Sequence, residues 1–174
     1  MTLSGKKVAV LAENQYEDLE LWYPLLRMQE AGAETTVVGS GTAETYHGKC
    51  GYPVKPDTTI DKVRAEQFDA VIIPGGWAPD FMRRSPAMIR FVKEAFEQDK
   101  VVAAICHAGS VLASAGVLKG KTATCFMAIK DDVINAGARY VDEPVVVDGN
   151  LITSRFPKDL PAFCREIIRA LEKR

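Results

Sequence analysis

Short apolar runs recur along the chain and predict the strands of a buried sheet. Each run is three to five residues long and lacks the apolar/polar alternation of a half-exposed strand. Strands that are apolar on both faces are typical of a parallel sheet covered on both sides. The five runs are Val8–Ala12, Thr35–Val38, Ala70–Ile73, Val101–Ile105 and Val145–Val147.

Segments with helical periodicity lie between several of these runs. In the first of them Leu21, Leu25 and Met28 recur at i, i+4 and i+7 on one helix face, and a proline at position 24 is expected to bend that helix. The predicted helices are Asp18–Ala31, a segment from Ser85 with Pro86 at its first position, a segment directly after Cys106, and a last one from Asp159, its N-cap, to the C-terminus. Strands that alternate with helices predict the α/β fold class.

Two short segments predict β-hairpins. They are Gly48–Tyr52 and Val145–Thr153, and the second contains an Asp-Gly turn. We expect both hairpins to add antiparallel strands at the edge of the sheet. The 174 residues contain no internal repeat and no linker, so the sequence predicts a single domain over residues 1–174.

The composition excludes several classes of protein. Lys plus Arg number 22 and Asp plus Glu 23, a net charge of −1, so no positive field is present to hold a nucleic-acid backbone. The apolar run after Lys6 and Lys7 is too short for an export signal, and the longest uncharged stretch, Val101–Leu118, contains a histidine, two serines and two glycines that argue against a membrane span. We therefore expect a cytoplasmic protein without nucleic-acid or membrane partners, suited to a small-molecule substrate or a stress response.

The four cysteines do not form a disulfide or zinc pattern. They are 56, 19 and 39 residues apart, with no CxxC pair and no nearby histidine cluster. In a reducing cytoplasm they are expected to remain free thiols. Cys50, Cys125 and Cys164 lack a catalytic setting, and we assign them no chemistry. No metal and no organic cofactor is expected.

Cys106 differs from the other three cysteines because it follows a buried run and precedes small residues that open a helix. This layout is that of a nucleophile elbow, in which a sharp strand-to-helix turn lifts the nucleophile clear of the sheet. A helix N-terminus favours the thiolate, so the sequence predicts a primed nucleophile. The alternative is a buried cysteine that acts as a small hydrophobe, and the neighbouring His107 makes this the weaker interpretation.

Only two histidines are available as a base. His47 is expected to be an exposed turn residue, and no histidine follows His107, so a glutamine-amidotransferase-like site with its later histidine is excluded. A Cys/His pair must therefore be Cys106 with His107. Two loops carry further polar groups: Glu13–Asp18, with three acidic residues, and Pro74–Asp80, whose glycines leave N–H groups free for an oxyanion. Taken alone, such loops are also typical of a helix cap and a plain turn.

Six segments together resemble a known family. They are YEDLEL, DAVIIPGGWAPD, VVAAICHAG, GVLKGKTAT, DDVINAGA and VVVDGNLITSRFPKDLPAF. In order and spacing they are similar to the ThiJ/PfpI superfamily, which includes the parkinsonism-associated deglycase, and specifically to its PfpI-like intracellular-protease branch. The resemblance spans nearly the whole chain. It implies a flavodoxin-like three-layer α/β sandwich, like that of class I glutamine amidotransferases, with a mostly parallel sheet, helices on both faces and a cysteine on the nucleophile elbow.

The resemblance also implies roles for individual residues. Cys106 matches the elbow cysteine, Glu17 the acidic partner from the first loop, and Gly76 the oxyanion-hole amide of the PGG turn. In the PfpI-like branch His107 matches the histidine after the cysteine, and Asp80 matches the acid that orients this histidine from a neighbouring subunit. A homo-oligomer, dimer or hexamer, with a shared active site is therefore expected.

Three positions depart from the family pattern. Ala108 stands where glycine is usual, and Phe126 stands where some members place a tyrosine near the cysteine. Trp77 lies beside the oxyanion turn, where it is expected to narrow the pocket. Without a phenol hydroxyl and with a narrower pocket, peptidase activity is less favoured, whereas the thiol site itself is intact.

These residues predict two enzyme activities and one non-catalytic role. An ionised carboxylate would oppose a thiolate, so Glu17 is expected to be protonated and to donate a hydrogen bond to the Cys106 sulfur. The thiolate would then add to a 2-oxoaldehyde such as methylglyoxal, or to its early adduct on an amine or thiol, with Glu17 and His107 moving protons until water releases a 2-hydroxy acid. This is glyoxalase or deglycase chemistry. Peptide hydrolysis through an acyl-cysteine and redox sensing by Cys106 oxidation are the alternatives.

Overall fold

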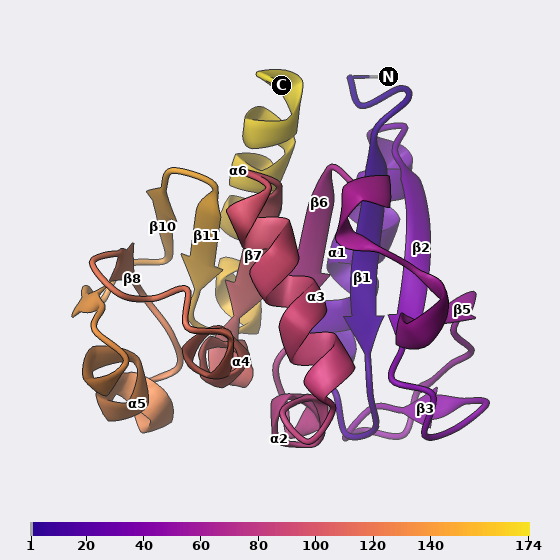
Figure 1. Ribbon diagram of the computed structural model, residues 1–174. Helices are drawn as coiled ribbons and strands as arrows, with labels where there is room; N and C mark the ends of the chain where they lie inside the picture. The colour runs from indigo at the N-terminus through magenta and orange to yellow at the C-terminus, as the bar shows by residue number, and fades with distance from the viewer. Residues whose placement is uncertain (1) are drawn as a thin grey trace.

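A seven-stranded sheet forms the centre of the computed structural model, which describes residues 2–174 (Figure 1). Its strands are β1 (Lys7–Ala12), β2 (Glu34–Gly39), β5 (Thr58–Thr59), β6 (Ala70–Ile73), β7 (Val101–Ile105), β10 (Val145–Asp148) and β11 (Leu151–Ser154). They lie in the order β10-β11-β7-β6-β1-β2-β5, and all neighbours are parallel except β10, which is antiparallel to β11. The predicted α/β fold with a mostly parallel sheet is confirmed, and each predicted apolar run lies in a strand.

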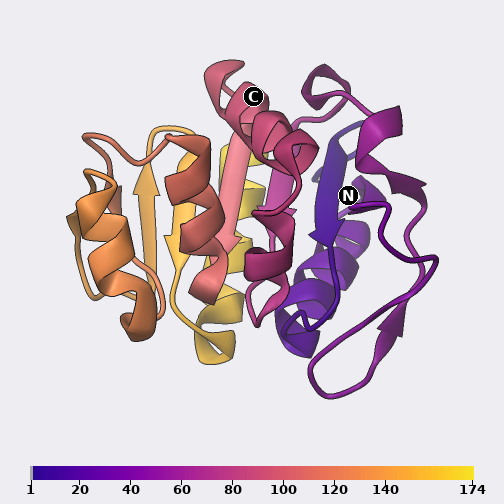
Figure 2. The ribbon, with the colours of Figure 1, turned by 60° about the horizontal axis from the view of Figure 1, so that its bottom comes forward.

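Helices cover both faces of this sheet. They are α1 (Asp18–Glu30), α2 (Ala78–Met82), α3 (Pro86–Glu97), α4 (Gly109–Ala115), α5 (Lys130–Asn135) and α6 (Leu160–Glu172), and 3₁₀ turns occupy Ile60–Lys62, Ala65–Gln67, Cys106–Ala108, Met127–Ile129 and Pro157–Asp159. The helices α1 and α6 contact each other on one face, and α3, α4 and α5 lie side by side on the other (Figure 2). The molecule is therefore a three-layer sandwich.

The apolar patterns of the sequence account for this packing. Every residue of β6 and β7 is buried, as is β1 after its first residue. Leu21, Leu25 and Met28 form the buried face of α1, which continues through Pro24. Removing a side chain of this size from water contributes about 1.5–3 kcal/mol, which offsets part of the entropy lost on folding.

The longest uncharged stretch, residues 101–118, divides into β7, a 3₁₀ turn and the short helix α4. This division into two separate elements was expected from its small and polar residues. Within residues 2–174 no helix has the length and apolar character needed to cross a membrane.

The first residues of α3 and α6 were both predicted to be preceded by a capping side chain, and only the one before α3 makes the capping hydrogen bond. Ser85 caps α3 as expected, since its Oγ accepts a hydrogen bond from the Met88 N–H (3.3 Å). Asp159 stands at the N-cap position of the last helix as expected, but its carboxylate makes no capping hydrogen bond. It accepts hydrogen bonds from the Arg155 guanidinium instead, at 2.8 and 3.3 Å. Two charge-assisted hydrogen bonds to the guanidinium thus replace the one that a capping carboxylate would accept.

The two predicted hairpins form, but only one joins the central sheet. β3 (Tyr46–His47) and β4 (Pro53–Val54) make a separate two-stranded sheet, because β5 already occupies the free edge of β2. The second hairpin joins the central sheet through β11, which pairs in parallel with β7. β10 is therefore the only strand of this hairpin that runs antiparallel to the rest of the sheet. The sequence missed a small parallel pair, β8 (Thr122–Ala123) with β9 (Arg139–Tyr140), whose strands are too short to show a pattern.

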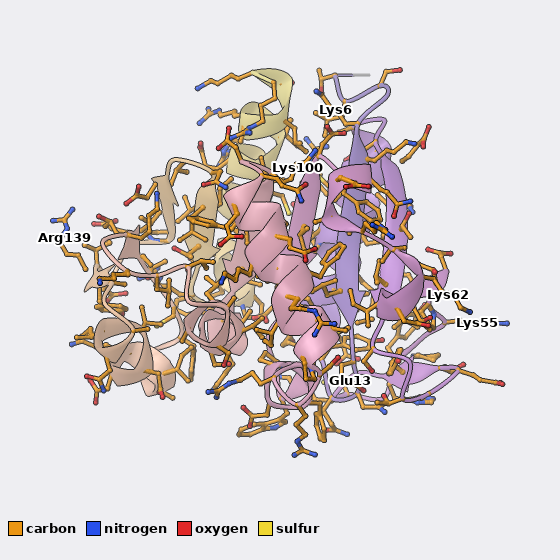
Figure 3. The ribbon with its side chains drawn as sticks, in the orientation of Figure 1. Lys6, Glu13, Lys55, Lys62, Lys100 and Arg139 are labelled. Carbon is orange, nitrogen blue, oxygen red and sulfur yellow. The ribbon has the colours of Figure 1, made fainter. Side chains whose placement is uncertain are left out.

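The strand order reverses at β1, because β2 lies on one side of it and β6 on the other. Ligands of open α/β sheets bind beyond the carboxyl ends of the strands at such a reversal. In Figure 3, Glu13, which follows β1, lies at one end of the sheet, and Lys6 and Lys100, which precede β1 and β7, lie at the opposite end. The loops after β1, β6 and β7 therefore meet at the end marked by Glu13.

Candidate active site

Cys106 lies on a strained turn between β7 and the helical segment that follows it. Its φ angle is +62°, a left-handed conformation that costs a residue with a Cβ about 1–3 kcal/mol. The backbone of the turn is held by a hydrogen bond from the Phe126 N–H to the Cys106 carbonyl (3.3 Å) and by one from the Ser110 hydroxyl to the His107 carbonyl (2.8 Å). This is the nucleophile elbow that the sequence predicted.

Gly75 allows a carboxyl group and the thiol to meet behind the elbow. A Cβ at this position would lie 2.5 Å from Glu20 Oε2 and 2.6 Å from the Cys106 Cβ, which is closer than side chains can approach. The Gly75 N–H donates a hydrogen bond to Glu20 Oε2 (2.9 Å). The missing side chain thus brings the loop after β6, the first turn of α1 and the elbow into direct contact.

Glu20, and not Glu17, is the acidic partner of Cys106, so the predicted assignment is wrong. Glu20 is completely buried, and its Oε1 has no hydrogen-bond partner among residues 2–174. Its Oε2 and the Cys106 Cβ lie on either side of Gly75, and Cys106 lowers the pKa of Glu20. Glu17 is the N-cap of α1: its Oε2 accepts the Glu20 N–H (2.9 Å), and its Oε1 lies 3.9 Å from the Lys49 ammonium. The cap position commits the Glu17 carboxylate to the helix terminus, where the first four N–H groups of a helix lack intrahelical carbonyl partners.

A signal for Glu20 was present in the sequence. Position 20 falls on the same helix face as Leu21, Pro24 and Leu25, all of which are buried. A carboxylic acid within a buried stripe is rare unless it is paired or functional.

The Glu20 carboxyl is protonated at neutral pH. Burial, and after it the charge of Glu17, raises the pKa of Glu20 to about 8, while the Gly75 N–H, Cys106 and Lys49 oppose this shift. Loss of charge is the usual response of a carboxyl group that is removed from water. Glu20 thus has the protonation that the sequence analysis expected of Glu17.

The resting thiol is also protonated, contrary to the predicted primed thiolate. Burial, and after it the charge of an ionised Glu20, raises the pKa of the Cys106 thiol. The helix α4 begins only at Gly109, beyond a 3₁₀ turn, so its N-terminus does not offset the burial. The N–H groups of Gly76 and His107 act in the opposite direction, because both hydrogen-bond to the sulfur and lower its pKa.

The Gly76 N–H therefore points toward the Cys106 sulfur, as expected of an oxyanion donor. It adopts φ +74°, and a Cβ there would lie 2.4 Å from the Glu17 nitrogen, so glycine is required. The loop after β1 fixes it through the Trp77 N–H, which donates to the Gln15 carbonyl (2.8 Å). Together with the His107 N–H, the Gly76 N–H converges on the place where charge would develop next to the sulfur.

His107 can accept a proton from the thiol. Its Nδ1 lies 3.3 Å from the Cys106 Sγ, a contact that the non-helical conformation of the elbow permits. Its ring stacks on Phe126, with centroids 5.0 Å apart, and Trp77 lies 5.7 Å away on a tilted plane. Burial lowers the pKa of His107, the charge of Asp80 raises it and that of Lys49 lowers it further, so the ring is neutral at pH 7.

Asp80 and the two aromatic residues lie around His107. Asp80 is exposed on α2 and acts on the His107 of its own chain through space, without a hydrogen bond to it within residues 2–174. Trp77 is more than half exposed and forms the outer wall. Phe126 occupies the stacking position without a hydroxyl group, as the sequence indicated.

The other candidate groups are away from this site or inert. Cys50 and His47 are exposed, and Cys125 and Cys164 are buried thiols whose pKa burial raises to about 12. Residues 2–174 contain no cluster of three or more His, Cys, Asp or Glu side chains placed to hold a metal ion. Sequence reasoning missed Lys49, since its position depends on a loop that packs against α1 from far along the chain.

The site thus combines a cysteine on a strained elbow, a buried carboxyl group behind a PGG turn and a histidine directly after the cysteine. The model of the DJ-1/PfpI family matches residues 6–170. The chain belongs to the DJ-1/PfpI family. This membership confirms the resemblance seen in the sequence.

Members of the DJ-1/PfpI family with curated names are similar over almost their whole length. Deglycase PfpI of Pyrococcus furiosus is 43% identical over 166 residues, which are 95% of this chain and 99% of the relative. YraA of Bacillus subtilis, provisionally named a cysteine protease, is 43% identical over 168 residues, which are 97% of this chain and 99% of the relative. These names support an enzyme of the DJ-1/PfpI family.

Solved DJ-1/PfpI structures share the fold. Drosophila melanogaster DJ-1beta is 32% identical with a TM-score of 0.90, covering 97% of this chain and 91% of that one. A two-domain protein from Anabaena variabilis, with DJ-1/ThiJ/PfpI-like and ferritin-like domains, is 51% identical with a TM-score of 0.93 over 95% of this chain. The match covers 48% of that protein, so the chain spans about half of its length.

Proposed function

We propose that the protein is a cysteine-dependent enzyme of glyoxalase or deglycase type, which acts on 2-oxoaldehydes such as methylglyoxal and on their early adducts. The observation that carries this proposal is the buried Glu20 carboxyl group against the Cys106 thiol. A pKa of about 8 lets Glu20 both release and take up a proton near neutral pH, which is the range in which a general acid and base is most effective. A hydrolase that forms an acyl-cysteine from a peptide has less need of such a group behind its nucleophile.

The reaction begins with addition of sulfur to the aldehyde carbon. The thiol proton passes to His107 Nδ1, 3.3 Å from the sulfur, as the carbon–sulfur bond forms. The aldehyde oxygen becomes an oxyanion, accepts hydrogen bonds from the N–H groups of Gly76 and His107, and takes the proton of Glu20. The product of this step is a hemithioacetal, and Glu20 is left as a carboxylate.

Glu20 then carries a proton between two carbons. As a carboxylate it removes the proton from the former aldehyde carbon, while the protonated His107 gives its proton to the ketone oxygen, which leaves an enediol and a neutral His107. Glu20 then gives its proton to the neighbouring carbon and takes up the proton of the enediol hydroxyl next to the sulfur, which gives a 2-hydroxyacyl thioester of Cys106. Water, with its proton accepted by the neutral His107, hydrolyses this thioester to the 2-hydroxy acid, and His107 returns that proton to the leaving Cys106 sulfur. The aldehyde carbon is oxidised and the ketone carbon reduced, so the sum is the addition of one water and needs no outside oxidant or cofactor. With an adduct as substrate, the bond from the former aldehyde carbon to the amine or thiol breaks as the Cys106 sulfur bonds to that carbon, and the leaving group departs with the proton of the Cys106 thiol.

Peptide hydrolysis is the second candidate, supported by the name of the relative from Bacillus subtilis. It would use Cys106, His107 and the same oxyanion donors. Trp77 beside the oxyanion turn and Phe126 in place of a tyrosine favour a small substrate over a peptide. Oxidation of Cys106 as a redox signal is a third candidate, since a protonated Glu20 could donate to a sulfinate.

We also propose that the working unit is a homo-oligomer in which Asp80 reaches the His107 of a neighbouring subunit. Asp80 is exposed on α2 and so is free to meet another chain. The outer face of α1 presents Leu19 and Leu26, each 55% exposed, next to an exposed Tyr52. An apolar surface of this kind is a candidate for contact between copies.

The proposed reaction is tested by methylglyoxal turnover and peptide cleavage, measured for the wild type and for Cys106→Ser. We expect the wild type to form 2-hydroxy acid and the variant to lose this activity. Unchanged turnover in the variant would exclude Cys106 as nucleophile. Peptide cleavage without methylglyoxal turnover would favour the peptidase.

A further inference from the structure

The loop between β3 and β4 is fastened to the start of α1. The Asp18 carboxylate accepts hydrogen bonds from the N–H groups of Cys50 (2.9 Å) and Tyr52 (3.1 Å). Gly48 makes room for this carboxylate, because a Cβ there would lie 2.3 Å from Asp18 Oδ1. We call this arrangement of Asp18, Gly48, Cys50 and Tyr52 the Asp18 clamp.

The clamp places Lys49 beside the acidic residues of the site. The Lys49 N–H donates to the Tyr16 carbonyl (2.8 Å), which fixes the backbone of this residue against the loop after β1. Its ammonium group lies 3.9 Å from Glu17 Oε1, at the helix terminus next to Glu20. Lys49 lowers the pKa of Glu20 and that of His107.

We propose that Lys49 is a positioning residue for proton transfer, whose ammonium group balances the charge of Glu17 and thereby sets the protonation of Glu20 and His107. Nothing in the family resemblance assigned a role to this loop. The effect on turnover rests on the proposed function, whereas the effect on protonation does not.

The charges around the site determine the direction of the effect. Glu17 and Glu20 face the site from α1, Cys106 and His107 from the elbow, Asp80 from α2 and Lys49 from the β3–β4 loop. Without the ammonium group, the negative charges of Glu17 and Asp80 are no longer opposed. Both Glu20 and His107 would then bind their protons more tightly, which raises the pKa of each.

The consequence for the reaction is a shift toward alkaline pH. His107 would be neutral, and able to take the thiol proton, only at higher pH. Glu20 would release its proton only at higher pH. Lys49 therefore keeps both groups near the physiological range, where a general acid and base works best.

The test measures the titration profile of the His107 imidazole, followed by its NMR signals between pH 4 and pH 10. The spectrum of His107→Gln identifies these signals, since the chain has only two histidines. We expect Lys49→Met to move the titration profile of His107 toward alkaline values by about half a pH unit or more, and Lys49→Arg to keep the profile of the wild type, because arginine restores the charge. Lys55→Met is the matched control, since Lys55 extends away from the sheet (Figure 3).

A second variant tests the clamp and guards against a folding defect. Asp18→Asn weakens the hold on the loop without touching Lys49, and it is expected to shift the profile in the same direction by a smaller amount. Thermal unfolding identifies any variant that fails to fold, and a shift in Asp18→Asn then still supports the proposal.

Two results would overturn the inference. One is a profile for Lys49→Met that matches those of the wild type and Lys55→Met. The other is an equal shift in Lys49→Met and Lys49→Arg, because a loss of charge is then not the cause. If the wild type fails to convert methylglyoxal while the titration profile of His107 shifts as expected in Lys49→Met, the proposed function is wrong and the role of Lys49 in protonation is supported.

Discussion

The Glu20 carboxyl group lies against the Cys106 thiol, and Gly75, which has no side chain, leaves the space in which they meet. The two groups come from α1 and from the turn after β7, and they touch only because the loops after three parallel strands end at the same side of the sheet. Each holds a proton that it would lose in water at lower pH. The site therefore holds two protons that can be transferred, one on the Glu20 carboxyl group and one on the Cys106 thiol, and both groups are shielded from solvent.

Replacing Glu20 by glutamine is expected to abolish most of the methylglyoxal turnover. Glutamine keeps the hydrogen bond to the Gly75 N–H but can neither release nor take up a proton, and loss of a general acid and base costs about 10²–10⁴-fold in rate. Steady-state kinetics check this, with Glu17→Gln as the control. Glu17→Gln loses the cap of α1 and is expected to reduce turnover by less than about tenfold. The reverse order of effects would restore Glu17 as the acidic partner.

Adding a single methyl group at Gly75 is expected to separate the same two residues. In Gly75→Ala the new Cβ meets Glu20 Oε2 and the Cys106 Cβ, and overpacking of this kind costs about 1–3 kcal/mol. Turnover should fall together with the free energy of unfolding, measured with denaturant. Gly120→Ala is the control, because that glycine has φ +75° and open space around it, so alanine there adds only backbone strain. Equal turnover in both variants would contradict the close approach at Gly75.

The pattern of apolar residues was enough to predict the central sheet, except for its edge strand β5, and the elbow. A strand that is buried on both faces needs an unbroken apolar run, and a sharp turn after it needs small residues next to the nucleophile. These features are local in sequence. The β3–β4 hairpin was also predicted, but its position was not. β5 pairs with the edge of β2 and so keeps the hairpin out of the central sheet, and no local pattern indicates this pairing.

The choice between Glu17 and Glu20 shows more clearly what local sequence patterns leave undetermined. The two acids lie three residues apart and have the same side chain, but Glu17 precedes the helix as its N-cap, whereas Glu20 falls on its buried face. Which one caps α1 and which one is buried depends on the residue at which the helix begins. The position of Lys49 depends on the contact between Asp18 and Gly48, 30 residues apart, and leaves no local trace in the sequence.

Glu20 is expected to make the protein less stable at high pH. Its pKa of about 8 in the folded chain lies above the ordinary value of 4.5, so the folded state binds this proton more tightly than the unfolded state does. The resulting stability is fully present below the unfolded value and is lost as the pH rises toward about 8. Glu20→Gln removes this dependence, and at pH 8 it should be more stable than the wild type by about 1–4 kcal/mol.

Thermal or chemical unfolding at pH 5 and pH 8 measures this difference. The advantage of Glu20→Gln should be small at pH 5, where nearly all folded chains hold the proton. A variant that is inactive and yet more stable would identify Glu20 as a group kept for the reaction at the expense of stability. A stability advantage that does not change with pH would contradict the raised pKa of Glu20.

A shared active site predicts complementation between two damaged chains. Cys106→Ser lacks the nucleophile, and Asp80→Ala lacks the acid that we propose to act on the partner subunit's histidine, so each variant alone should have strongly reduced turnover. In a mixed pair, the chain that retains Cys106 would receive Asp80 from its partner and recover one intact site. Equal amounts that assemble at random would restore about a quarter of wild-type turnover, because half of the pairs are mixed and each has one intact site of two. Asp80 also acts through space on the His107 of its own chain. If that effect is the functional one, co-expression restores nothing, and the site is complete within each subunit.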